Sequence, residues 1–279
     1  MVPTKELREK AKLVRKWCLV STTEAASGHP TSCLSAADIA TVLFDRYFTY
    51  DPDNPLNLYN DRFVLSKGHA APLLYTLFGM AGAYPLEELK TLRKFGSVFE
   101  GHPVPKYKFA EAATGSLGQG LSLGAGLALV AKREGYPGKT YVLTGDGELA
   151  EGQIWEAANF AAHEKLNNLI VILDINRLGQ SQETMFGHHI EEYVSKFKAF
   201  DFEVITIDGH NYEEIDQALQ RAQQSAGKPV AIIAKTFKGH GISFLENKDG
   251  WHGKALKKEE LEKALQELSP IDDYLRFKL

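Results

Sequence analysis

Two short motifs in the sequence combine residue types that bind a divalent cation and a phosphate. The Gly-Asp-Gly segment around Asp146 follows the apolar run 140–144, and Asn176 follows the apolar run 168–175. A carboxylate and an amide oxygen are hard ligands that suit Mg²⁺ or Ca²⁺, and an incomplete protein shell leaves room for a phosphate oxygen. The flanking glycines let backbone N–H groups approach that phosphate. The pattern predicts a metal-and-phosphate site, although the same residue types also favour a plain turn.

Four of the nine histidines lie beside glycine or proline in predicted loops. Imidazoles exchange protons near neutral pH and form hydrogen bonds with hydroxyls, carbonyls and phosphates. Four such side chains favour one shared reaction site, and they are His29, His69, His102 and His252. A zinc site is not expected, because no close cluster has ligand spacing. Five histidines stay unassigned: His163, His188, His189, His210 and His240.

The predicted elements explain how the cation ligands meet. A short strand is expected at 62–66, and strands rich in valine and isoleucine are expected at 140–144, 168–175, 203–207 and 229–235. Apolar strands that alternate with helices predict a parallel sheet with helices on both faces. The 28 residues 148–175 are about the length of one strand–helix–strand crossover, which would place Asp146 and Asn176 at the ends of neighbouring strands. Ligands of open parallel sheets collect at those carboxyl ends.

The N-terminal part is expected to form a helical elaboration of this α/β fold. Apolar residues recur at spacings of four, three and four between Leu7 and Cys18, which indicates one helix face. A second helix is predicted over 35–47, opened by Ser35 with Asp38 three residues later, as in a capping box. Further helices are expected near 70–80, 85–95, 121–131, 154–165, 190–199, 212–226 and 256–268.

Composition limits the class of protein. The 279 residues are 44% hydrophobic and 24% charged, and no linker divides them, so a single domain over 1–279 is expected. A net charge of −4 argues against nucleic-acid or anionic-lipid partners. Two cysteines without a CxxC pattern suit a reducing compartment. Without a secretory signal or an apolar run of about 18 residues, we expect a cytoplasmic protein with no membrane partner.

Several motifs, in order, resemble those of transketolases, which depend on thiamine diphosphate. Besides Gly145-Asp146-Gly147 and Asn176, they are Ser27-Gly28-His29-Pro30, Ser66-Lys67-Gly68-His69-Ala70, Gly101-His102-Pro103, Thr114-Gly115-Ser116-Leu117-Gly118-Gln119-Gly120 and Trp251-His252-Gly253. The resemblance runs over essentially the whole chain but covers only the N-terminal, diphosphate-binding half of a full-length transketolase. It implies the α/β thiamine-diphosphate-binding fold, called the PP domain. Segment 114–120 is not a dinucleotide fingerprint, so an NAD site is not expected.

The resemblance also implies roles for individual residues. His29 and His102 would contact the sugar near the reacting carbons, whereas His69 and His252 would lie near the diphosphate and thiazolium, with His252 also a candidate for proton transfer. Side chains of Asp146 and Asn176, with the carbonyl of Leu178, would bind Mg²⁺, for which Ca²⁺ or Mn²⁺ could substitute. The predicted cofactor-binding residues are Ser32, His69, Gly115, Ser116, Leu117, Gly147, Glu148, Asn176, Gln180, Lys238 and His252.

Some of these residues have simpler interpretations. Leu117 could be ordinary core, Lys238 a solvated surface charge, and Glu148 or Glu151 a partner of a helix dipole. In the family, residues matching Glu151 and Glu156 belong to an acidic network that connects two active sites across a dimer. Crowded carboxylates can share protons with raised pKa values, which gives such a network a physical basis. We count both glutamates among the candidate catalytic residues.

The resemblance implies a partner as well. In this family, a glutamate from a second, pyrimidine-binding domain activates the cofactor, and the predicted last helix, 256–268, leaves no residues here to build that domain. We therefore expect the N-terminal subunit of a split transketolase, joined to a C-terminal subunit as an α₂β₂ heterotetramer. The assembly would move a two-carbon ketol unit from a ketose phosphate to an aldose phosphate, as in the pentose phosphate pathway.

Two alternatives stay open. A different thiamine-dependent enzyme, such as a deoxyxylulose phosphate synthase or a keto acid dehydrogenase E1 α-subunit, is disfavoured by His29, His102 and Trp251-His252-Gly253. A non-catalytic cofactor-binding or regulatory subunit is disfavoured by Asp146, Asn176 and the four loop histidines. A ketose donor assay separates the first alternative from a transketolase.

Overall fold

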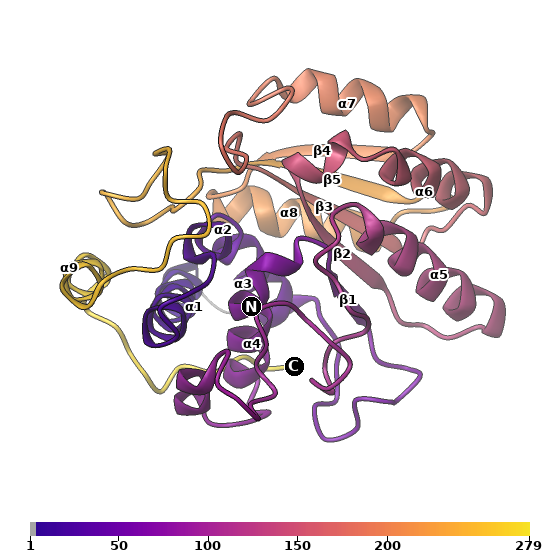
Figure 1. Ribbon diagram of the computed structural model, residues 1–279. Helices are drawn as coiled ribbons and strands as arrows, with labels where there is room; N and C mark the ends of the chain where they lie inside the picture. Colours follow the sequence, from indigo (N-terminus) through magenta and orange to yellow (C-terminus); the bar gives the residue numbers. More distant parts are fainter. Residues whose placement is uncertain (1–3) are drawn as a thin grey trace.

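The computed structural model describes residues 4–279 and is organised around a five-stranded parallel sheet (Figure 1). The strand order is β1-β2-β3-β5-β4, and each pair of neighbours is parallel. The strands are β1 (Arg62–Leu65), β2 (Thr140–Gly145), β3 (Leu169–Ile175), β4 (Glu203–Asp208) and β5 (Val230–Lys235). Each strand boundary lies within one residue of its predicted position, and the predicted parallel α/β fold is confirmed.

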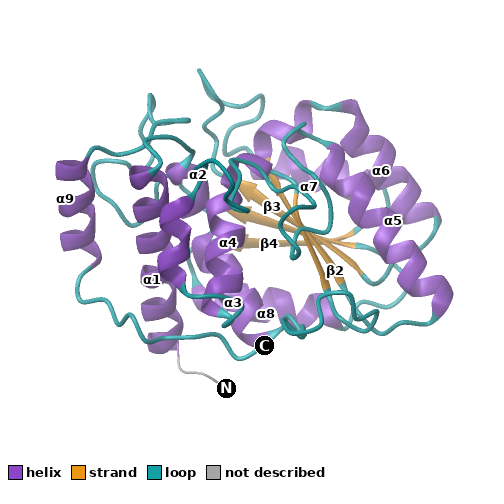
Figure 2. Cartoon of the chain, turned by 60° about the horizontal axis from the view of Figure 1, so that its bottom comes forward, coloured by secondary structure: helices purple, strands orange, loops and turns teal. Residues whose placement is uncertain are grey.

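Helices cover both faces of this sheet (Figure 2). They are α1 (Thr4–Glu24), α2 (Pro30–Leu34), α3 (Ala37–Arg46), α4 (Ala71–Met80), α5 (Gln119–Glu134), α6 (Gly152–His163), α7 (Ile190–Ala199), α8 (Tyr212–Gln223) and α9 (Lys258–Leu268). Alternate residues of a strand point to opposite faces. Accordingly, Leu143 and Ile172 pack with α1, α3, α4 and α8, whereas Val142 and Val171 pack with α5, α6 and α7.

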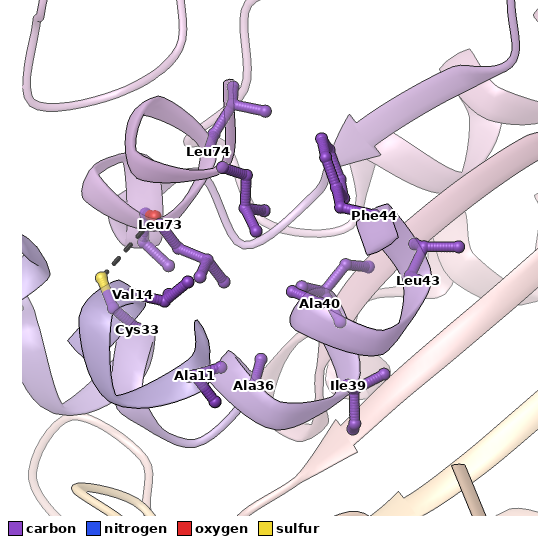
Figure 3. Packing of buried hydrophobic residues seen from close by; sticks show 14 of the residues in the cluster. Ala11, Val14, Cys33, Ala36, Ile39, Ala40, Leu43, Phe44, Leu73 and Leu74 are labelled. Atoms are coloured by element: carbon purple, nitrogen blue, oxygen red, sulfur yellow. Dashed lines mark hydrogen bonds between the residues drawn. The ribbon is translucent and has the colours of Figure 1, made fainter. Parts of the chain in front are cut away.

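The predicted helical N-terminal elaboration forms much of the first of these two cores (Figure 3). Val14 of α1, Cys33 of α2, Ala40 of α3 and Leu73 of α4 are all buried there. Both cysteines are buried free thiols. None of the described helices is long and apolar enough to cross a membrane. Val14 belongs to the apolar face predicted for the first helix, and its burial shows that the spacing identified the face of α1 that packs inward.

The prediction of one helix over 35–47 is wrong at its start. The chain instead forms α2 and then α3, and Ala36 precedes α3 without any side-chain cap. The Ser35 hydroxyl donates to a carboxylate of Asp174 at 2.6 Å, and Asp38 binds Arg15 through two hydrogen bonds. Buried partners from distant segments thus occupy the side chains that the capping box would have used.

The helix predicted over 85–95 is also wrong. This segment contains only the 3₁₀ helix η2 (Leu86–Thr91), and the chain then turns at Arg93, whose φ is 59°. The backbone N–H of Arg93 donates to the carbonyl of Phe99 at 2.8 Å, which closes a loop and ends the helical pattern. Two further 3₁₀ helices, η1 (Gly68–Ala70) and η3 (Asp146–Ala150), follow β1 and β2 near the sheet edge.

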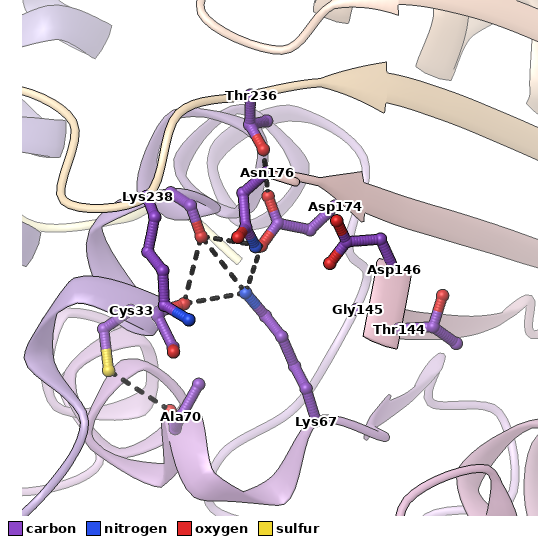
Figure 4. A network of polar contacts seen from close by, with 12 residues as sticks. Cys33, Lys67, Ala70, Thr144, Gly145, Asp146, Asp174, Asn176, Thr236 and Lys238 are labelled. Atoms are coloured by element: carbon purple, nitrogen blue, oxygen red, sulfur yellow. Dashed lines mark hydrogen bonds and ion pairs between the residues drawn. The ribbon is translucent and has the colours of Figure 1, made fainter. Parts of the chain in front are cut away.

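A buried ion pair joins segments from distant parts of the chain at this edge (Figure 4). Nζ of Lys67, just after β1, lies 2.5 Å from Oδ2 of Asp174 in β3, and both side chains are buried. The same ammonium donates to the carbonyl of Ser32 in α2 at 2.7 Å. The carboxylate accepts further hydrogen bonds from Ser35, Asn176 and Thr236. The pair therefore fixes α2 and the segment after β1 against the ends of β3 and β5.

We predict that Lys67→Met lowers the free energy of unfolding by about 3–5 kcal/mol, because the buried carboxylate of Asp174 loses its cationic partner while the volume is kept. Urea unfolding followed by circular dichroism measures this change. The matched control is Lys90→Met, which removes an exposed pair with Glu87 and should cost no more than about 1 kcal/mol. Equal effects of the two substitutions would contradict a central role for Lys67.

Candidate active site

A cavity of about 460 Å³ opens at the carboxyl ends of β2, β3 and β5, the sheet edge that the sequence predicts. β2 and β3 are neighbours, with Gly145 paired to Asp174, so the segments that follow them lie side by side. Seventeen residues line the cavity: His29, Ser32, Lys67, His69, His102, Gly115, Leu117, Gly145, Asp146, Gly147, Glu148, Asn176, Leu178, Gly179, Gln180, Lys238 and His252. Segments separated by more than 200 residues thus meet at one place.

Most of the predicted site residues are brought together here. All four loop histidines, the three predicted metal ligands and most predicted cofactor contacts line the cavity. Ser116, Glu151 and Glu156 do not line it, and all three are exposed on the surface of the chain. The unassigned histidines, His163, His188, His189, His210 and His240, are also outside the lining.

Asp146 is buried, and its surroundings favour the neutral carboxyl. Its Oδ2 accepts hydrogen bonds from the backbone N–H of Arg177 at 2.7 Å and from the hydroxyl of Thr184 at 2.9 Å. Burial, together with the nearby charge of Asp174, raises the pKa of Asp146 to about 6. A bound cation would stabilise the ionised form of a buried carboxyl group that has few compensating charges nearby.

The two other predicted ligands lie just beyond β3. Oδ1 of Asn176 accepts the backbone N–H of Leu178 at 3.3 Å, while its Nδ2 donates to Asp174 at 3.1 Å. These bonds orient the amide oxygen and fix the turn that carries the carbonyl of Leu178. The donor set of carboxylate, amide and carbonyl oxygens is the hard set expected for Mg²⁺.

Lys238 is buried, so its interpretation as a solvated surface charge is wrong. Its Nζ donates to the carbonyls of Leu178 at 2.7 Å and Gly179 at 3.2 Å, and lies 2.8 Å from Nδ1 of His252. Burial lowers the pKa of this ammonium to about 8, against the opposing effect of Asp146. A positive charge therefore sits on the carbonyl that the sequence predicted as a metal ligand.

Three imidazoles form a compact cluster in the cavity. Ring centroids lie 5.0 Å apart for His29 and His69, 4.9 Å for His29 and His252, and 5.5 Å for His69 and His252. Burial is the main cause that lowers the pKa of His29 and His252 to about 4, and that of His69 to about 2. All three rings are therefore neutral at about pH 7 and can accept or donate a hydrogen bond.

Two further features of the cavity concern His29 and Gly115. Nδ1 of His29 is buried without a hydrogen-bond partner among the described residues. Gly115 has a φ of 140°, and a Cβ there would lie 2.8 Å from Cδ2 of His102. Burial and the charge of Arg93 lower the pKa of His102. The cavity therefore contains one buried ring nitrogen that could bind a further polar group, and a glycine that lets the backbone approach the imidazole of His102 closely.

Glu148 accepts backbone N–H groups where η3 and α5 begin, which agrees with its interpretation as a partner of a helix dipole, although the side chain is buried. Its side chain accepts bonds from the hydroxyl of Ser66 at 2.6 Å and the N–H groups of Gly118 at 2.9 Å and Gly145 at 2.8 Å. Burial raises its pKa. Glu148 thus ties the glycine-rich segment 114–120 to the end of β2, and Leu117, 38% exposed, is not ordinary core.

Lys67 and Asp174 were not predicted as site residues. Lys67 lines the cavity and pairs with Asp174, which stands in the apolar strand Leu-Ile-Val-Ile-Leu-Asp-Ile. An ionisable residue inside such a strand signals a buried partner, because an isolated buried charge is costly. That signal existed in the sequence, but it does not identify the partner, which lies 107 residues away.

Known proteins share this architecture. Residues 7–278 match the family described as transketolase, thiamine diphosphate binding domain. Human transketolase is 49% identical over 265 residues, which are 94% of this chain and 42% of the human protein. A solved transketolase from Campylobacter jejuni subsp. jejuni NCTC 11168 has a TM-score of 0.91 and 37% identity, covering 99% of this chain and 44% of that one.

A shorter relative has a size similar to this chain. The 6-deoxy-6-sulfo-D-fructose transketolase subunit SqwG of Clostridium sp. (strain MSTE9) is 38% identical over 264 residues, which are 94% of this chain and 96% of that subunit. The chain thus spans less than half of the human and Campylobacter transketolases but nearly all of this subunit. On the match over residues 7–278, the chain belongs to the transketolase family of thiamine diphosphate binding domains.

Proposed function

We propose that this chain is the N-terminal subunit of a split transketolase, forming a single diphosphate-binding domain over 1–279. The observation that carries the proposal is the cavity, in which hard oxygen ligands and buried cations lie beside a cluster of neutral imidazoles. The first group of side chains suits a metal–diphosphate, and the second suits the hydroxyls and carbonyl of a sugar. With a C-terminal subunit, the chain would transfer a two-carbon ketol unit from a ketose phosphate to an aldose phosphate.

The residues present fit Mg²⁺ and thiamine diphosphate. Asp146, Asn176 and the carbonyl of Leu178 would hold the cation, and Lys238 would shift from that carbonyl toward the diphosphate oxygens. Further proposed cofactor contacts are Ser32, His69, Gly115, Ser116, Leu117, Gly147, Glu148, Gln180 and His252. When bound, the cofactor supplies a nucleophilic carbon that no side chain of the protein provides. The chain supplies binding, orientation and charge.

The histidines would act on the sugar. His29 and His102 would orient the donor by hydrogen bonds, and His252 would hold a proton of a sugar oxygen. Their lowered pKa values keep the rings neutral at neutral pH, and a neutral imidazole can both donate a hydrogen bond to a sugar oxygen and accept one from a sugar hydroxyl. The buried Nδ1 of His29, which has no partner among residues 4–279, is available for such a bond.

A partner subunit is supported by the relative that resembles this chain in length. That relative is described as a transketolase subunit, and the chain covers 96% of it. A C-terminal chain would supply the pyrimidine-binding domain and the activating glutamate, and an α₂β₂ assembly is the arrangement we expect. Glu151 and Glu156, exposed at the start of α6, are positioned where a second chain could reach them. The cytoplasmic location stays a prediction.

We expect cofactor binding to weaken in acid because protons compete with the metal at Asp146. Burial raises the pKa of Asp146 to about 6. The carboxyl is therefore mostly ionised at about pH 7.5 but mostly protonated below about pH 6. Binding of thiamine diphosphate with Mg²⁺, measured by calorimetry, should fall about tenfold per pH unit below that pKa.

Asp146→Asn is the informative variant for this measurement. This variant should bind thiamine diphosphate weakly both at about pH 7.5 and below about pH 6, so its affinity should no longer fall in acid. The control Asp53→Asn, which changes an exposed carboxylate, should behave like the unmodified chain. Full Mg²⁺-dependent affinity in Asp146→Asn would contradict the assignment of this residue as a ligand.

The proposed function is tested by reconstitution. The purified chain, checked by mass spectrometry for a copurified partner, should show no ketol transfer, and addition of a C-terminal transketolase subunit should restore activity and tighten cofactor binding together. Donors should include xylulose 5-phosphate and fructose 6-phosphate, because transketolases from Pichia stipitis have been solved in complex with these sugars. They should also include 6-deoxy-6-sulfofructose, because the relative of similar length is described as a transketolase subunit for that sugar. Turnover by the chain alone would refute the split subunit. Cofactor binding without turnover of any sugar in the assembly would favour a regulatory subunit.

In the reconstituted enzyme, His102→Ala should lower kcat/KM for the donor by about 10²–10⁴, the usual range for acid–base and positioning help, while cofactor affinity stays unchanged. The control is His163→Ala, which removes an exposed histidine at the end of α6. Normal donor kinetics in His102→Ala would show that this imidazole only packs against Gly115.

A further inference from the structure

A second polar network lies outside the cavity and centres on Asp38 of α3. This carboxylate is 2% exposed and accepts two hydrogen bonds from Arg15 of α1, at 2.9 Å and 2.7 Å. The hydroxyl of Tyr212 in α8 also donates to it. The guanidinium strongly lowers the pKa of Asp38, so the carboxylate is ionised. Three helices are thereby joined around one buried charge.

His210 connects this carboxylate to the segment that follows β5. Its Nδ1 lies 2.9 Å from Oδ2 of Asp38, and its Nε2 accepts the backbone N–H of Phe237 at 2.9 Å. Because Nε2 acts as the acceptor, the ring proton is on Nδ1 and is donated to Asp38. The ring of His240 stacks on that of His210, with centroids 3.5 Å apart. The tautomer of His210 is thus set by its two partners.

Arg15 holds the same segment from the other side of Lys238. Its Nε donates to the carbonyl of His240 at 3.0 Å, and the N–H of Gly239 donates to the carbonyl of Thr31 at 3.0 Å. Together with the bond from Phe237 to His210, these contacts fix the backbone immediately before and after Lys238. Lys238 is therefore held between two anchored points while its side chain reaches into the cavity.

The ligand atoms of Asp38 and His210 are already used, which argues against a metal site there. Asp38, His210 and His240 offer ligand atoms within 4.8 Å of one another. However, both oxygens of Asp38 accept hydrogen bonds, and the lone pair of Nε2 in His210 faces a backbone N–H. Arg15 already supplies the positive charge that balances Asp38. The role of the network therefore lies in the segment after β5, which Arg15 and His210 bind.

We propose that Asp38, Arg15 and His210 are positioning residues that hold Lys238 against the diphosphate of the cofactor. The inference rests on the proposed function, because it assumes that Lys238 contacts that diphosphate. A mobile segment would have to become ordered when the cofactor binds, and that ordering costs free energy. Because the backbone on both sides of Lys238 is anchored, the segment is already ordered in the folded chain.

A double-mutant cycle tests the proposal in the full chain, alone and with its C-terminal subunit. The measured quantity is the Kd for thiamine diphosphate with Mg²⁺, in His210→Ala, Lys238→Ala and the double variant. We expect His210→Ala to raise the Kd about tenfold, and the double variant to bind no more weakly than Lys238→Ala, because His210 acts through that side chain. Independent, multiplicative effects would overturn the proposal, and His163→Ala is the matched control.

A measurement without ligand tests the anchoring itself. Hydrogen exchange, followed by mass spectrometry, should be faster in the peptide that contains Phe237 and Gly239 in His210→Ala, but unchanged in His163→Ala. Unchanged exchange in His210→Ala would overturn the proposal even if that variant bound cofactor weakly. If the unmodified protein binds no cofactor, the proposed function fails, while the exchange result still decides whether His210 anchors the segment.

Discussion

The buried pair of Lys67 and Asp174 is the interaction on which the site depends. It brings together α2, the segment after β1 and the ends of β3 and β5, and each of these contributes residues to the cavity. Apolar packing alone could hold these segments near one another, but it has no directional preference. A carboxylate that accepts four hydrogen bonds allows few arrangements. The pair therefore determines the geometry, while the two apolar cores supply the stabilisation.

The electrostatics of the cavity follow from burial more than from net charge. Burial keeps the three clustered imidazoles neutral and raises the pKa of Asp146, while Lys238 stays largely protonated at neutral pH with a pKa of about 8. A metal ion would stabilise the carboxylate of Asp146, and a diphosphate would accept hydrogen bonds from the ammonium. The site is thus complementary to a cation and an anion bound together, which matches the family to which the chain belongs.

Two networks of the same type support this site. Lys67, which pairs with Asp174, lines the cavity, whereas Arg15, which pairs with Asp38, is outside the lining and binds the segment that carries Lys238. In both, a buried carboxylate collects donors from three or more segments. Buried charges of this kind add little net stability but restrict the alternatives for packing. Their role in this chain is to set positions.

Apolar periodicity and turn residues are local properties of the sequence, and they were sufficient to predict the sheet, most of the helices and the placement of Asp146 and Asn176. The sequence did not determine that Ser35 and Asp38 bind distant partners instead of capping a helix, or that Glu148 and Lys238 are buried. Those outcomes depend on contacts between residues that are distant in the sequence, such as Arg15 with Asp38, 23 residues apart, and Ser35 with Asp174, 139 residues apart. Only the tertiary structure decides them, since a polar side chain binds whichever partner the fold brings to it.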